Sequence, residues 1–130
     1  MSKAWRLMGH YNAETQAYSA CAGALATSPW TSDFSGKLVG LRTQVSDEAA
    51  TSLVEHVQIR LTCAAWKPNT IEVFAQGRGL ATVPCHSQEA KDFVIDQPIY
   101  PGTPITIEAR NDVATAITNS TFIYGCFEVS

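Results

Sequence analysis

Apolar and polar residues alternate with a period of two along several stretches of this chain, and one stretch shows the pattern most clearly. It runs from Leu53 to Trp66 and sets Val57, Ile59, Leu61, Cys63 and Ala65 on one side against His56, Gln58, Arg60 and Thr62 on the other. A helix would place Val57 and Ile59 about 200° apart around its axis. The alternation therefore predicts a strand with one face toward water, against which the rest of the chain packs.

Shorter stretches repeat this alternation and predict strands over residues 3–11, 37–45, 70–75, 80–83, 92–96 and 105–110. In the first, Trp5, Leu7, Gly9 and Tyr11 are expected to share one face, and in the second Val39, Leu41, Thr43 and Val45 do. The Ala-rich segment from Thr15 to Ala26 also suits a helix, but its Thr, Tyr and Cys residues favour a strand.

Turn-forming residues separate these stretches. Lys67-Pro68-Asn69 predicts the turn of a hairpin, and Gly77-Arg78-Gly79 predicts another turn. Three prolines between Gln97 and Pro104 indicate a rigid connection that cannot lie in the middle of a sheet. Ser46 to Ser52 is typical of a single helical turn, with a serine cap followed by two acidic residues.

The final strand, over about residues 118–129, is apolar on both faces. Phe122, Tyr124 and Cys126 lie on one face, with Ile123, Gly125, Phe127 and Val129 on the other. Such a strand lies between layers or against another molecule, so we expect it in the centre of a sheet. With eight or nine strands and no helical layer, residues 1–130 are expected to form a single all-β domain, an antiparallel β-sandwich resembling a jelly roll.

The composition favours self-association. Charged residues make up 16% of the 130 residues, below the usual quarter, and the net charge is −3. The nine cations are spread singly, which argues against direct nucleic-acid binding. No apolar run reaches the length of a transmembrane helix, and Met1 is not followed by a secretory signal, so we expect synthesis in a cytoplasm.

The sequence contains no signature of catalysis. Cys21, Cys63, Cys85 and Cys126 are widely spaced, which favours buried thiols, with disulfide pairing and metal ligation as alternatives. His56 adjoins Glu55, but neighbours in a strand point to opposite faces, and the adjacency of Cys85 and His86 is not the geometry of a nucleophile and base. We therefore expect no enzyme, cofactor or metal, although a sandwich enzyme with a metal near His56 or His86 stays open.

Aromatic residues are the candidate contact residues for a partner or ligand: Trp30, Trp66, Tyr100, Phe122 and Tyr124. Trp30, which follows a proline, is expected either to close one end of the core or to form an exposed contact. Together with Trp5 and the tyrosines, these tryptophans could also form a platform on which sugars stack. A lectin-like, carbohydrate-binding sandwich is therefore the main alternative function, and the identity of any small ligand stays open.

Four segments carry a resemblance to a known family: Gly36–Arg42, the strand Val57–Cys63, the Pro101-Gly102 turn, and Phe122–Val129. With these strand lengths the chain resembles the small single jelly-roll subunits of viral shells, particularly those of tailless double-stranded DNA viruses. The resemblance implies a structural protein of the virion, made in the host cytoplasm, that joins copies of itself or a related subunit into a closed capsid. The absence of a basic terminal arm departs from shells that bind the genome directly.

Overall fold

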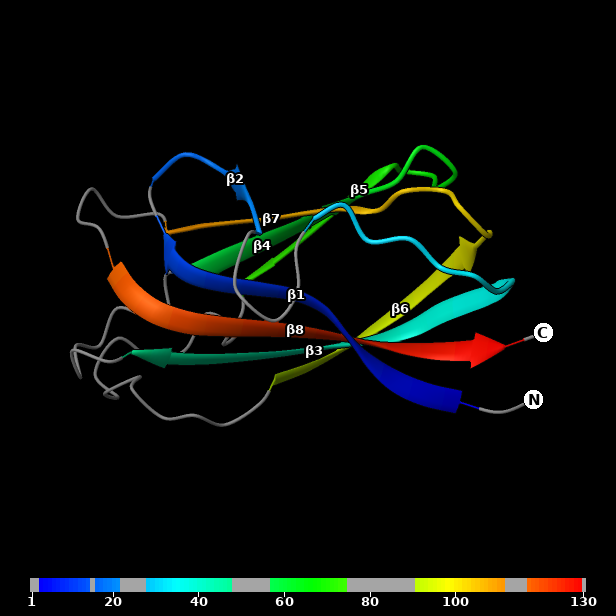
Figure 1. Cartoon of the computed structure of the whole chain (residues 1–130), viewed down its shortest axis with the longest axis horizontal. Helices are drawn as coiled ribbons and strands as arrows, with labels where there is room; N and C mark the ends of the chain where they lie inside the picture. Colours follow the sequence, from blue (N-terminus) through cyan, green and yellow to red (C-terminus); the bar gives the residue numbers. More distant parts are fainter. Residues whose placement is uncertain are drawn as a thin grey trace.

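The computed structural model describes residues 3–14, 16–21, 28–47, 57–74, 91–111 and 117–129. These residues contain eight strands and no helix: β1 (Lys3–Glu14), β2 (Ser19–Ala20), β3 (Gly36–Asp47), β4 (Val57–Thr62), β5 (Thr70–Phe74), β6 (Lys91–Ile99), β7 (Thr106–Asn111) and β8 (Ile117–Val129). They form two four-stranded antiparallel sheets that face each other (Figure 1). The predicted antiparallel β-sandwich is confirmed.

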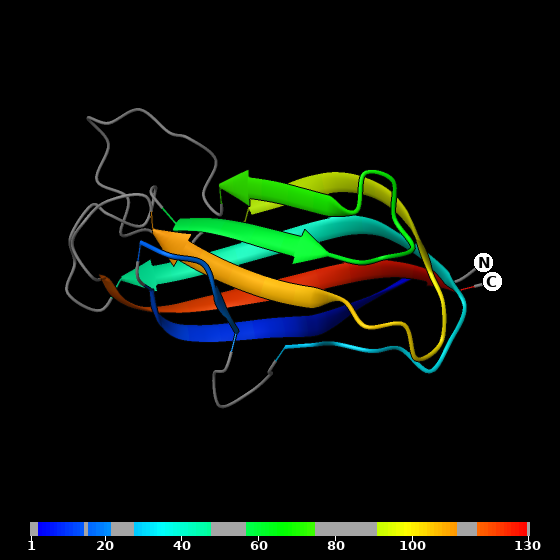
Figure 2. The same ribbon diagram turned by 90° about the horizontal axis from the view of Figure 1, so that it is seen from above.

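The strands of the second half of the chain pair with those of the first half in reverse order. Sheet A has the order β1-β8-β3-β6 and sheet B the order β2-β7-β4-β5, and Figure 2 shows sheet B in front of sheet A. The first strand pairs with the eighth, the second with the seventh, the third with the sixth and the fourth with the fifth, all antiparallel. Both termini therefore lie side by side at one end of the sandwich (Figure 1).

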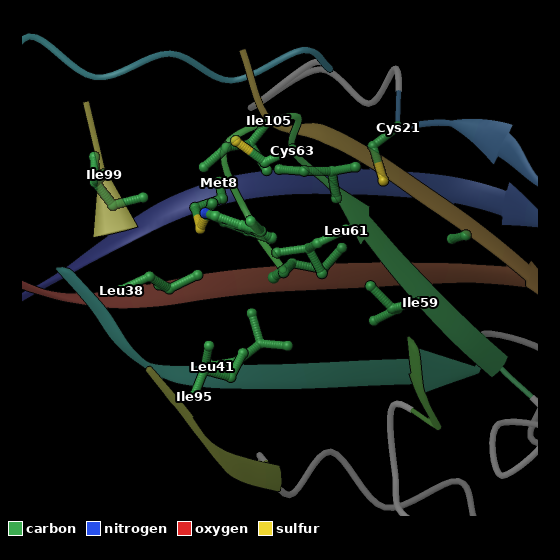
Figure 3. Packing of buried hydrophobic residues seen from close by; sticks show 14 of the residues in the cluster. Met8, Cys21, Leu38, Leu41, Ile59, Leu61, Cys63, Ile95, Ile99 and Ile105 are labelled. Atoms are coloured by element: carbon green, nitrogen blue, oxygen red, sulfur yellow. The ribbon is translucent and has the colours of Figure 1, made fainter. Parts of the chain in front are cut away.

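The alternation predicted for β4 is confirmed. Val57, Ile59 and Leu61 are buried, whereas Gln58 and Arg60 on the opposite side are partly exposed. The buried residues of both sheets meet in one core, to which Met8, Cys21, Leu38, Leu41, Cys63, Ile95, Ile99, Ile105, Ile107, Ile123 and Phe127 also belong (Figure 3). Removal of these apolar side chains from water is the main force that holds the two sheets together.

The β4–β5 hairpin turns where the prolines and polar residues predict it. The Cys63 amide donates to the carbonyl of Asn69 at 2.9 Å, and the Trp66 amide donates to the carbonyl of Cys63 at 3.1 Å. The strand ends at Thr62, earlier than expected, because the chain then bends to bury Trp66 under this turn. The Pro101-Gly102 turn is also present, and Gly102 has a φ of 75°, which favours glycine.

Bulges in β1 and β3 change which residues point into the core from those that the alternation predicts. In β3 the register shifts between Leu38 and Gly40, so Leu38 and Leu41 both point into the core instead of to opposite faces. In β1 it shifts between Leu7 and Gly9. The extra residue in each bulge reverses the alternation beyond it, so Leu7 points outward while Gly9 points toward the core.

Several predicted boundaries also change. β3 continues to Asp47, so Ser46 does not cap a helical turn, because its pairing with β8 extends that far. In the region expected to be one strand from Thr15 to Ala26, β2 covers Ser19–Ala20. β6 continues through Pro98, which is tolerated because β6 is an edge strand of sheet A. The predicted strand 80–83, the turn 77–79, and Glu55, His56, Cys85 and His86 lie outside the described residues.

Candidate interaction surface

The outer face of sheet B is a polar surface whose side chains are bonded to one another. The Arg60 guanidinium donates to Glu108 at 3.0 Å. Arg110 donates twice to the Gln58 side-chain oxygen, at 2.7 and 3.0 Å, and the Gln58 amide donates to Glu72 at 3.1 Å. Charged and polar groups paired in this way are typical of a face that lies against water.

Tyr18 completes this polar surface. The guanidinium of Arg60 lies 3.9 Å from the centroid of the Tyr18 ring, and that of Arg110 lies 4.7 Å from it. The Tyr18 hydroxyl donates a hydrogen bond to the Glu72 carboxylate at 3.2 Å. Burial and the nearby Glu72 carboxylate raise the pKa of Tyr18 to about 12, against the opposing effect of the two arginines. The phenol therefore stays neutral and serves as a platform for the arginines.

The outer face of sheet A is aromatic and apolar at its centre. Cross-strand pairing places Trp5, Cys126, Gly40 and Val94 in one row across the sheet's four strands. Trp5 is 43% exposed and Val94 is 96% exposed. A side chain on Gly40 would lie 3.4 Å from the Trp5 ring, so glycine leaves room for the indole to lie across the sheet. An exposed valine and tryptophan on one sheet face are typical of a contact surface.

Two hollows flank Trp5 on this face. The larger, of about 430 Å³, is lined by Trp5, Leu7, Arg42, Gln44 and Tyr124. The smaller, of about 260 Å³, is lined by Lys3, Trp5, Val39, Gly40, Phe93, Val94 and Cys126. The Arg42 guanidinium lies 4.3 Å from the centroid of the Trp5 ring and covers the indole. The surface is thus uneven, with apolar depressions beside an exposed apolar knob.

Two of the five predicted contact aromatics pack in or against the core. Trp66 is 2% exposed, and its indole N–H donates to the carbonyl of Pro98 at 2.9 Å, so its expected role as a contact is wrong. Trp30 is half-buried and stacks on Phe127 with the ring centroids 4.9 Å apart. Trp30 therefore closes one end of the core, which was the first of its two predicted roles.

The other three predicted aromatics are at least partly exposed, and two of them lie on the outer face of sheet A. Tyr124 lines the larger hollow, and Phe122 stacks on His10 with the ring centroids 4.6 Å apart. Tyr100 is exposed but belongs to the turn that precedes Gly102. Phe122 and Tyr124 therefore belong to the candidate surface, and Tyr100 lies apart from it.

The two most exposed apolar residues of this surface were not among the predicted contact residues, although Trp5 was considered for a sugar-stacking platform. Trp5 was expected on the same face as Gly9 and Tyr11, and the bulge after Leu7 separates it from them. Val94 lies between Phe93 and Ile95, which both point inward from β6. The run of three apolar residues could have indicated the exposure of Val94, because the middle residue of such a run in a strand points away from the core when its neighbours point into it.

The described residues include buried thiols but no cluster of metal ligands. Among them, no group of three or more His, Cys, Asp or Glu side chains could hold a metal ion. Cys21, Cys63 and Cys126 are buried thiols, as the spacing favoured, and Cys85 lies outside the described part. In the same part of the chain, no helix is long and apolar enough to cross a membrane.

Comparisons of the whole chain with models of known protein families and with curated proteins found no match.

Proposed function

We propose that this chain is a structural protein that assembles with copies of itself or a related subunit, as a capsid or shell component of a virion. The observation that carries the proposal is the contrast between the two outer faces. Sheet B presents arginines, acids and amides that are bonded to one another, whereas sheet A presents Trp5 and Val94 beside two hollows. An apolar, uneven face on a protein of low charge is best explained by burial against another subunit.

The nested strand pairing supports the same proposal. Pairing of the first strand with the eighth, the second with the seventh and so on is the arrangement of a long antiparallel ribbon rolled into two sheets. We take this as a jelly roll, an architecture that viral capsid and lectin domains share. Together with the resemblance of its strand lengths to small shell subunits, this supports our proposal that the chain acts in the virion, after synthesis in the host cytoplasm.

A carbohydrate-binding module is the second candidate, and the larger hollow favours it because Trp5, Tyr124 and Gln44 line it together. Aromatic rings and amides are suitable groups for stacking on and bonding to a sugar. However, the Arg42 guanidinium already lies over the Trp5 ring, and Trp30 and Trp66 pack in the interior. The assembly function therefore has the stronger support.

Light scattering on a sizing column over a wide range of protein concentration tests the proposal, with electron microscopy of any large fraction. We expect oligomers that grow with concentration, and Val94→Asp should weaken them because a charge would be buried in the contact. Ala64→Asp is the matched control, since Ala64 is exposed in the β4–β5 turn. A monodisperse monomer at every concentration would refute the assembly function, and binding on a glycan array with quenching of tryptophan fluorescence would then support the second candidate.

A further inference from the structure

Four charges of alternating sign form a row across the outer face of sheet A, at the end where both termini lie. The row consists of Lys3 on β1, Glu128 on β8, Lys37 on β3 and Asp96 on β6. Glu128 is the cross-strand partner of both lysines. On β6 the cross-strand partner of Lys37 is Pro98, and Asp96, two residues before it, completes the row through its carboxylate, which lies 3.8 Å from the Lys37 ammonium. Across the four strands the signs therefore read plus, minus, plus, minus.

The ion pairs within this row are long, and three of their four side chains are well exposed, with Glu128 partly buried. Lys3 lies 4.0 Å from Glu128, at the limit of an ion pair, and Lys37 and Asp96 both have well-exposed side chains. Exposed pairs of this geometry contribute little to the stability of a single chain. Their alternation is more informative, because a row that reads plus, minus, plus, minus is complementary to itself when it is reversed.

Reversal is the effect of a two-fold axis that runs along the strands between two copies of sheet A packed face to face. Such an axis keeps the charged end of one copy over the charged end of the other and exchanges the edge strand β1 with β6. Lys37 then faces Glu128 of the second copy, and Lys3 lies over Pro98 of the second copy, one outward position along β6 from Asp96 and within reach of its carboxylate. All four charges of each copy meet the opposite sign, as a two-fold interface requires of a surface that contacts itself.

The same reversal suits the next row of the sheet. Trp5, Cys126, Gly40 and Val94 follow one another from β1 to β6, so the reversal places Val94 of one copy over Trp5 of the other. Val94 is the most exposed large apolar residue among the described ones, and the 260 Å³ hollow adjoins Trp5. Val94 and Trp5 both line this hollow, so the reversal brings the exposed apolar side chains at its two sides together, and symmetry makes this contact twice.

Edge-to-edge pairing is a less suitable way to join two copies through sheet A. β1, one free edge of the sheet, is interrupted by two register shifts, after Leu7 and after Tyr11. β6, the other edge, contains Pro98, which has no amide hydrogen to donate. Bulges and prolines are features that block the addition of strands to an edge, which leaves the face of the sheet as the contact.

We propose that the building block of the assembly is a two-fold dimer in which sheet A of one copy packs face to face on sheet A of another, with the two charged rows antiparallel. The inference rests on the proposed function and specifies its partner as a second copy of this chain. Two sheets packed in this way keep their strands within about 30° of each other, which allows the rows to meet near the axis.

Charge reversal in complementary pairs tests this arrangement. A variant with Lys3→Glu and Lys37→Glu carries four negative charges in the row, and a variant with Asp96→Lys and Glu128→Lys carries four positive ones. We expect each variant alone to self-associate on the order of a hundredfold more weakly than the original chain. An equimolar mixture should regain a dimer that contains one copy of each, measured by sedimentation and by native mass spectrometry.

The controls separate this arrangement from assembly in general. Lys67→Glu changes an exposed charge in the β4–β5 turn and should leave association unchanged, and circular dichroism verifies the fold of each variant. If Glu128→Lys prevents folding, Lys3→Glu and Asp96→Lys alone form the complementary pair, because the two-fold axis brings these residues within one outward position of each other.

Three results would overturn the proposal. A monomeric original chain would refute the assembly function itself. Self-association of both double variants at the original strength would refute this dimer while the assembly function stands. Loss of association in both variants without recovery on mixing would place the row at a contact but exclude the two-fold reversal.

Discussion

Replacement of Trp66 by phenylalanine should destabilise the fold by an amount that the structure allows us to work out. The substitution removes the indole donor to the carbonyl of Pro98, a bond of 2.9 Å within a site where Trp66 is 2% exposed. A lost hydrogen bond of this kind costs about 1 kcal/mol. The smaller ring also removes buried carbon worth about 0.8 kcal/mol per methylene-sized group, which adds about 1–2 kcal/mol. We expect a total loss of about 2–3 kcal/mol in the free energy of unfolding.

Urea unfolding followed by far-ultraviolet circular dichroism measures this loss without using tryptophan as the probe. The midpoint should fall by about 1 M for a slope of about 2–3 kcal/mol per M. Trp5→Phe, at a site 43% exposed on the outer face of sheet A, is the control and should change stability by no more than about 0.5 kcal/mol. Both substitutions belong in a Val94→Asp background, so that self-association contributes equally. Equal midpoints for the two variants would refute the burial of Trp66.

Three further predictions concern the core and the polar face. Ile59→Asp should prevent folding because it places an unpaired charge in the core, whereas Gln58→Asp on the outer face should stay folded by circular dichroism; equal stability would refute the assignment of faces. Gly125→Ala should destabilise the fold by about 1–3 kcal/mol in urea, since the added carbon would lie 2.5 Å from the Met8 sulfur, and an unchanged midpoint would contradict this packing. Because burial raises the pKa of Tyr18 to about 12, the contribution of Tyr18 to stability should be complete below pH 10 and lost as the pH rises toward 12. In an absorbance titration at alkaline pH, one phenolate should form later than the others, and Tyr18→Phe should remove that step.

Alternation was enough to predict most strands and the faces of several of them, β4 and β7 among them. In β4, Ile59 points into the core and Gln58 away from it, as the period of two requires. In β8 the two apolar faces predicted a central strand, and β8 lies between β1 and β3. These predictions succeed because each depends on neighbours within one strand and on nothing farther away.

The failures all depend on contacts between distant parts of the chain. The bulges in β1 and β3 arise from their pairing with β8, and a period of two contains no sign of them. Trp66 lies 32 residues from Pro98, the acceptor of its hydrogen bond, so its burial could not be inferred from its own turn. Phe122 and Tyr124 were predicted as contact residues because the apolar outer side of β8 is visible in sequence, whereas Trp5 was misplaced by the bulge.

Strand β8 links the stability of the fold to the proposed assembly. Its inward residues include Ile123 and Phe127, which are fully buried, and its outward residues include Tyr124 and Cys126, which line the hollows beside Trp5. Neighbouring residues of a strand alternate between faces, so the backbone that positions the core side chains also positions the outward side chains that shape the outer face. A shell subunit needs a contact surface that is present before its partner arrives, and a central strand with two neighbours is held more rigidly than any loop. For this reason we expect the assembly surface to follow the sheet rather than the loops at its ends.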